Sequence, residues 1–219
     1  KRQELSRIQK IVCQKVVSSF QSNVSAYLSV DVEVSAAISA LERRVLKNKI
    51  IIRLNELIIK FTAEALRAFP LFNAFYWEDE IIYYQPVNVA VIMDNNGELV
   101  LCVIADTDKK TIEEIARESS LFQMKIMRNK LSPQDCQNAT FTVTNPGSFG
   151  VTHFMPVINL YQSAILGVSS ITKRITQDKA GFVTKDILPL EITYDHRIIN
   201  GIQAAKFLNF IKERIESCI

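Results

Sequence analysis

A histidine near the C-terminal end of the sequence has a setting that suits acid–base chemistry. The segment 188–207 reads LPLEITYDHRIINGIQAAKF, so an apolar, extended run ends at Tyr194, His196 follows in a turn, and Gly201 leads into a helical pattern. A loop at the end of a strand is a common place for a cleft, and a neutral imidazole can act as a general base near physiological pH. The residues alone favour the alternative, a structural histidine that only hydrogen-bonds the turn.

A second turn carries hydroxyl groups. The segment 140–154 reads TFTVTNPGSFGVTHF, in which two glycines permit a tight turn beside the hydroxyls of Thr144 and Ser148. A hydroxyl can stabilise the oxyanion that develops during acyl transfer. A capped turn with satisfied hydroxyls is the alternative interpretation. His153 stands among β-branched and aromatic residues, and we interpret it as structural.

Regular elements must position these two turns. Ser35 can cap the second predicted helix, residues 94–97 form a turn, and Pro189 is expected to interrupt the last strand. The order of the elements favours one α/β domain. Apolar spacing predicts helices at 4–20, 35–46, 54–69, 111–128 and 202–215, and alternating or β-branched runs predict strands at 24–34, 81–84, 87–93, 99–105, 140–144, 164–168 and 183–194.

Composition excludes several classes of protein. The 219 residues are 48% hydrophobic and 22% charged, which excludes intrinsic disorder. A net charge of +3 is too balanced to favour nucleic acid as a partner. Four scattered cysteines and two histidines make a metal site improbable, and no apolar run has membrane-spanning length. We expect a soluble protein of a reducing compartment, the cytoplasm or, in a eukaryote, the mitochondrial matrix.

The pattern D-H-R-x-x-x-G at 195–201 resembles the catalytic domain of the dihydrolipoyl acyltransferases of 2-oxo acid dehydrogenase complexes, which are related to chloramphenicol acetyltransferase. The resemblance covers nearly the whole chain in order, and seven segments carry it: 6–10, 69–74, 97–108, 130–133, 140–150, 164–168 and 195–201.

The resemblance implies a fold and an activity. The fold would be that of the chloramphenicol acetyltransferase-like, coenzyme A (CoA)-dependent acyltransferases, a mixed sheet flanked by helices, with 1–219 as one catalytic domain and no lipoyl or peripheral-subunit-binding domain. His196 would take a proton from the thiol of CoA or of a dihydrolipoyl arm, and Thr144 would support the oxyanion. CoA or acetyl-CoA would be a substrate, with no metal. The site would lie between subunits of a homotrimer, which a lipoyl or acyl carrier domain would visit.

The sequence departs from the family pattern at several positions. The family has serine where Thr144 stands and usually aspartate where Asn200 stands. Asn200 keeps an acceptor but loses the charge, so it cannot form a salt bridge with Arg197. We expect this change to weaken the orienting role of Asn200 without abolishing the chemistry, and we count Asn200 with His196 and Thr144 as catalytic. Segments 24–27 and 97–103, which lie near the substrate channel in the family, also differ. We expect the remaining motif residues to shape the turns and the substrate site rather than to carry the proton: Asp195, Arg197, Gly201, Asn145 and Ser148.

Two other functions remain open at this point. One is a stand-alone acetyltransferase of the same fold that acetylates a hydroxyl of a small-molecule or carrier-bound natural-product intermediate, as in tetronate pathways. The other is an inactive structural core subunit, against which the retained His196 and Thr144 argue. We read 178–180 as a surface turn without lipoyl attachment. If the ending at Cys218 and Ile219, soon after the last helix, is the native one, a lone trimer is expected rather than a large cage; if the chain is cut there, nothing follows about the assembly.

Overall fold

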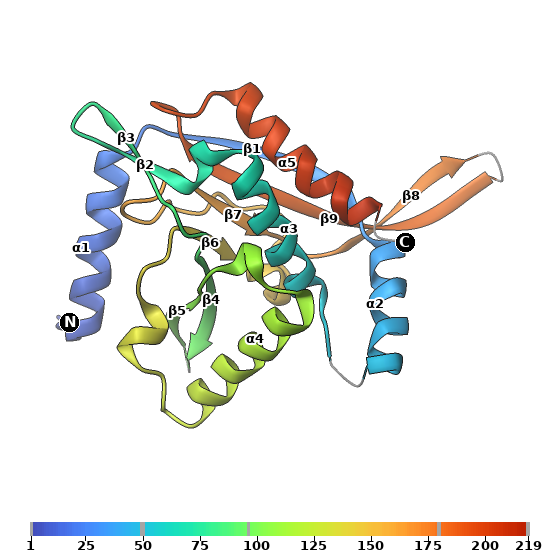
Figure 1. Ribbon diagram of the computed structural model, residues 1–219, viewed down its shortest axis with the longest axis horizontal. Helices are drawn as coiled ribbons and strands as arrows, with labels where there is room; N and C mark the ends of the chain where they lie inside the picture. Colours follow the sequence, from blue (N-terminus) through green and yellow to red (C-terminus); the bar gives the residue numbers. More distant parts are fainter. Residues whose placement is uncertain (1, 49–50, 96, 179–180, 218–219) are drawn as a thin grey trace.

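The computed structural model describes residues 2–48, 51–95, 97–178 and 181–217 (Figure 1). The helices are α1 (Arg7–Ser22), α2 (Ser35–Asn48), α3 (Leu54–Ala68), α4 (Ile112–Met127) and α5 (Gly201–Glu216), with short 3-10 turns at Pro70–Asn73, Thr107–Lys109, Pro133–Cys136 and Pro146–Phe149. The strands are β1 (Ser25–Glu33), β2 (Ala74–Trp77), β3 (Glu80–Tyr83), β4 (Val89–Asn95), β5 (Glu98–Ile104), β6 (Phe141–Thr144), β7 (Ala164–Val168), β8 (Thr172–Asp178) and β9 (Gly181–Asp195).

A mixed sheet forms the centre of the molecule. Its strands run in the order β1-β9-β7-β6-β4-β5, and β8 pairs with the first part of β9. The pairs β4–β6 and β6–β7 are parallel, whereas the other pairs are antiparallel. Helix α5 lies along β1 and β9, α4 lies against β4 and β5, and α3 packs between α4 and α5 (Figure 1). The predicted mixed sheet with flanking helices is therefore confirmed.

Strand β9 shows why one face of the sheet holds the core and the other holds polar groups. Successive side chains of a strand point to opposite faces. Leu188, Leu190 and Ile192 belong to the hydrophobic core, whereas Glu191 and Asp195 alternate with them and face the other way. The segment that follows β6 supplies partners on this second face, since the backbone N–H of Phe154 donates to the Glu191 carboxylate.

The predicted interruption of the last strand at Pro189 is wrong. Strand β9 runs without a break through Pro189, which pairs with Asp31 of β1. The last pair between β7 and β9 is Val168 with Leu190, so Pro189 lies just beyond the end of β7, where its carbonyl accepts from the N–H of Ser169 at 3.1 Å. Because no ladder bond is required from its nitrogen there, the proline costs the sheet little.

Other predicted elements shift at their ends. Ser35 is the first residue of α2 rather than its cap, and its hydroxyl accepts from the backbone N–H of Asp186 on β9. Thr111, by contrast, caps α4 through the N–H of Glu114. Strands β2 and β8 were not predicted. The proposed surface turn at 178–180 includes residues outside those that the structure describes.

Helix α1 presents apolar side chains to solvent. Ser19 is buried and its hydroxyl donates to the carbonyl of Ile158, which ties the helix to the segment that follows β6. Around this buried residue the helix is open, with Val12, Val16 and Phe20 exposed. Figure 1 places α1 at one end of the molecule and the β8–β9 hairpin at the other. Among the helices of the described residues, none is long and apolar enough to cross a membrane.

Candidate acyltransferase site

The turn after β9 holds His196 at the surface. Its backbone N–H donates to the carbonyl of Val24 at 2.8 Å, which fixes the turn to the residue before β1. The imidazole ring is exposed and lies 5.7 Å from the ring of the buried Tyr194, centroid to centroid. An exposed imidazole on a fixed backbone can approach a substrate and exchange a proton with it.

Asp195 and Arg197 form an ion pair around this turn. The Asp195 carboxylate is 2% exposed and accepts from the Arg197 backbone N–H at 3.1 Å, from Nε at 2.9 Å and from Nη2 at 2.5 Å. The hydrogen bond to Asp195 raises the pKa of Arg197. The guanidinium also lies 4.1 Å above the ring of Tyr76. Among the described residues, neither charged side chain forms a hydrogen bond or ion pair with the imidazole, and the pair holds the backbone on both sides of His196.

Asn200 begins the last helix. Its side chain accepts from the backbone N–H of Gln203 at 3.0 Å, and the Gln203 side chain accepts from the Asn200 N–H at 2.9 Å. This reciprocal arrangement is a capping box, and Gly201 is the first helical residue after it. Asn200 and Arg197 share no hydrogen bond or ion pair in the described part of the chain.

Thr144 is the last residue of β6 and is half-buried. The tight turn after it is held by Asn145, whose side chain accepts from the Gly147 N–H at 3.0 Å and donates to Asn55 at 3.3 Å. A Cβ on Gly147 would lie 2.3 Å from the carbonyl oxygen of Ser169, so only glycine fits this approach. Ser148 follows on the exposed side of the turn.

The register of the sheet separates the two predicted catalytic residues within one chain. Thr144 pairs with Gly167, and Gly167 pairs with Glu191. His196 lies five residues beyond Glu191 along the chain. At about 3.3 Å per residue and about 4.8 Å between strands, His196 is about 17 Å along and about 10 Å across from Thr144. A single chain therefore does not bring the imidazole and the hydroxyl together.

The sequence analysis missed a buried carboxylate, that of Glu191, which is in register with Thr144 across the sheet. Glu191 is fully buried and accepts from the Ser169 hydroxyl at 2.8 Å and from the Phe154 N–H at 3.2 Å. Nδ1 of His153 lies 3.1 Å from it, although the His153 side chain is 58% exposed. Burial first, and then the charge of Glu191, raises the pKa of Tyr27. The only signal in the sequence is an isolated acid in an apolar strand.

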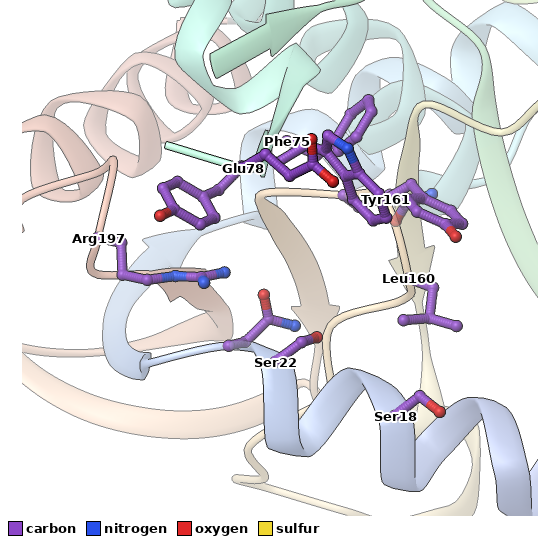
Figure 2. Close-up of a pocket in the computed structure, with 11 residues that line it drawn as sticks. Ser18, Ser22, Phe75, Glu78, Leu160, Tyr161 and Arg197 are labelled. Atoms are coloured by element: carbon purple, nitrogen blue, oxygen red, sulfur yellow. The ribbon is translucent and has the colours of Figure 1, made fainter. Parts of the chain in front are cut away.

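Two cavities lie near these turns. One of about 470 Å³ opens beside Asn145 and Ser148, and Glu56 and Ser119 contribute to its wall. Burial raises the pKa of Glu56. The other, of about 340 Å³, lies beside Arg197 (Figure 2). In the described ranges, no group of three or more His, Cys, Asp or Glu side chains is placed to hold a metal ion.

Comparison with solved structures first defines the fold. Chloramphenicol acetyltransferase superimposes with a TM-score of 0.55 at 11% identity, covering 94% of this chain and 93% of that chain, so the chain has a chloramphenicol acetyltransferase-like fold. A probable dihydrolipoamide acetyltransferase from Listeria monocytogenes is much closer, with a TM-score of 0.94 and 31% identity over 100% of this chain and 95% of that one.

Comparison of sequences then gives the family. The model of the 2-oxoacid dehydrogenases acyltransferase (catalytic domain) matches residues 1–219. The dihydrolipoyllysine-residue acetyltransferase component of the pyruvate dehydrogenase complex of Rickettsia prowazekii is 32% identical over 97% of this chain and 53% of its own length. The chain belongs to this acyltransferase family, as the sequence motifs indicated, and it spans about half the length of the curated relatives it matches.

Proposed function

We propose that this chain is the catalytic part of an acyltransferase that moves an acetyl or short acyl group between CoA and a dihydrolipoyl thiol. The observation that carries the proposal is that Thr144 and His196 lie toward opposite ends of the sheet, because β6, which ends at Thr144, and β9, which ends just before His196, run in opposite directions. The chain that places them so belongs to the 2-oxoacid dehydrogenase acyltransferase family. A matched curated relative is named a dihydrolipoyllysine-residue acetyltransferase, and this name supports a thiol as the acceptor of the acyl group.

The chemistry needs one base and one hydrogen-bond donor. His196 takes the proton from the attacking thiol, and the thiolate adds to the thioester carbonyl. The Thr144 hydroxyl donates to the oxyanion of the tetrahedral intermediate. When the intermediate collapses, the carbon–sulfur bond of the original thioester breaks and the departing thiolate takes the proton from His196. A new thioester and a free thiol result, so neither a metal nor an oxidant is required.

Two copies of the chain must meet to complete this site. His196 lies at the end of the sheet near α1, because the β9 turn is bonded to Val24, two residues after α1 ends. Thr144 lies toward the other end of the sheet. Joining one end of a chain to the opposite end of the next is a heterologous contact, which closes into a ring when the rotation permits. We infer a homotrimer with His196 and Thr144 supplied by neighbouring subunits.

The same proposal extends to partners and setting. Residues 1–219 act as one catalytic domain, a lipoyl domain brings the acyl group, and CoA or acetyl-CoA is the second substrate. The cytoplasm, or the mitochondrial matrix of a eukaryote, is the expected location. A hydroxyl acceptor of the natural-product type is the weaker candidate, because the names of the matched relatives favour the thiol acceptor.

The test is acetyl transfer from acetyl-CoA to free dihydrolipoamide. His196→Ala should lose most of the turnover while the assembly, measured by light scattering, persists. His153→Asn is the matched control, because His153 is the only other histidine of the sequence and its Nδ1 lies 3.1 Å from the Glu191 carboxylate. Normal turnover in His196→Ala, or an equal loss in both variants, would overturn the proposal.

A further inference from the structure

Two asparagine side chains tie the turn that follows Thr144 to helix α3. Asn145, on the turn, donates from its side-chain nitrogen to the side-chain oxygen of Asn55 at 3.3 Å. The two residues lie 90 positions apart in the sequence, and Asn55 is the second residue of α3. This hydrogen bond therefore joins the residue next to the proposed oxyanion donor to a distant helix.

The chemistry of the Asn145 amide defines what Asn55 contributes. The Asn145 side-chain oxygen accepts from the backbone N–H of Gly147 at 3.0 Å, so the side-chain nitrogen is the atom that faces Asn55. An amide nitrogen only donates, and Asn55 must therefore present its oxygen to Asn145. Asn55 acts here as a hydrogen-bond acceptor, a role that aspartate can also fill and alanine cannot.

The sheet holds Thr144 on one side only. Strand β6 pairs with β7 as far as Thr144 itself, which lies opposite Gly167, but its pairing with β4 ends one residue earlier, at Val143. The cavity of about 470 Å³ opens beside this end of the β4 pairing, and Asn55 and Asn145 both line it. Packing against the turn is incomplete there, so the hydrogen bond between the two asparagines holds the turn where the sheet does not.

Helix α3 is a rigid anchor for this hydrogen bond. Its next turn is part of the hydrophobic core, since the residues from Leu57 to Ile59 are at most 4% exposed. At the start of the helix, the Glu56 carboxylate accepts from the backbone N–H of Arg53 at 2.8 Å, which closes the first turn around Asn55. The position of Asn55, and through it that of Asn145, is therefore set by the core of the protein.

We infer that Asn55 is a positioning residue for the oxyanion donor. Through Asn145 it fixes the end of β6, so that the Thr144 hydroxyl stays where the oxyanion develops. The inference rests on the proposed function, because it assigns Asn55 to the same reaction. Misplacement of a reacting group by about 1 Å can cost about 100-fold in rate, and loss of the whole donor costs about 100-fold to 1000-fold. The loss of Thr144 is the upper limit for the loss of Asn55.

The test measures kcat and KM for acetyl transfer from acetyl-CoA to dihydrolipoamide. Asn55→Ala should lower kcat by about 10-fold to 100-fold and change each KM by less than about 2-fold, because the oxyanion forms only in the transition state. Asn55→Asp keeps the acceptor and should restore most of kcat.

Gln123→Ala is the matched control for the alanine variant. Gln123 lines the same cavity from α4, and among the described residues it shares no hydrogen bond with Asn145. Its kcat should equal that of the wild type. An unchanged kcat in Asn55→Ala, or equal losses in the two alanine variants, would overturn the inference.

A double variant separates positioning of Thr144 from a general loss of structure. In a Thr144→Val background the hydroxyl is already gone, so adding Asn55→Ala should lower kcat by less than about 2-fold further. A merely structural Asn55 would lower kcat by the same factor in both backgrounds, and that result would refute the inference. Absence of transfer by the wild-type chain would refute the proposed function and this inference with it. Wild-type transfer that does not depend on Asn55 would refute the inference alone.

Discussion

Asp195→Asn tests how the turn that carries His196 is held. The substitution keeps the shape and one acceptor but removes the charge that pairs with Arg197. Removing one partner of a buried ion pair costs about 3–5 kcal/mol, because the other charge is left uncompensated. Here the Asp195 side chain is 2% exposed but that of Arg197 is 29% exposed, so water compensates part of the loss. We therefore expect Asp195→Asn to lower the free energy of unfolding by about 3 kcal/mol, the lower end of that range.

Thermal denaturation provides the assay. For a chain of this size, about 3 kcal/mol lowers Tm by about 6–12 °C. Asp79→Asn is the matched control, because Asp79 is exposed, accepts from the Tyr76 hydroxyl and has a positive φ that asparagine tolerates. It should change Tm by less than about 2 °C. A Tm for Asp195→Asn equal to that of the control would refute the view that the ion pair holds this turn. Turnover at 25 °C should also fall, since His196 lies between the paired residues.

Three further predictions follow from single contacts. Thr144→Val keeps the β-branched shape and should lower turnover about 100-fold to 1000-fold, whereas Thr144→Ser should restore it; an unchanged rate in the valine variant would exclude the hydroxyl from the reaction. Asn200→Asp should be tolerated, because aspartate caps a helix as well as asparagine, and a circular dichroism melt and a rate assay would reveal any collapse. Burial raises the pKa of Glu56, so the wild type should lose unfolding free energy as pH rises above the ordinary value of 4.5 and through the raised pKa. Glu56→Gln retains the acceptor for the Arg53 N–H and should remove that pH dependence in urea unfolding, and an identical pH profile would contradict this.

Much of the secondary structure was predictable from the sequence, because the local residue patterns agree with how the elements pack. The apolar run Ala164–Val168 is fully buried as β7, and the Thr111 cap with Glu114 three residues later starts α4 where predicted. The motif around His196 was readable for the same reason, since an apolar strand, a turn and a capped helix follow one another within 20 residues.

The parts that escaped prediction depend on contacts between distant segments. Pro189 is harmless only because β7 ends beside it, and that register cannot be read from the strand itself. Glu191 finds its partners in His153 and Ser169, which lie 38 and 22 residues away. The separation of His196 from Thr144 also follows from strand order and register, not from the local motifs.

Mixing two inactive variants tests most directly whether the site is shared between chains. His196→Ala and Thr144→Val chains, each assembled alone, should be nearly inactive. In a random 1:1 mixture that is unfolded and reassembled, a site has both residues intact when a Thr144→Val chain supplies His196 and its neighbour, a His196→Ala chain, supplies Thr144. This occurs at about a quarter of the sites, so transfer to dihydrolipoamide should recover to about 25% of the wild-type rate. A mixture as inactive as its parents, although fully assembled, would contradict a site shared between chains.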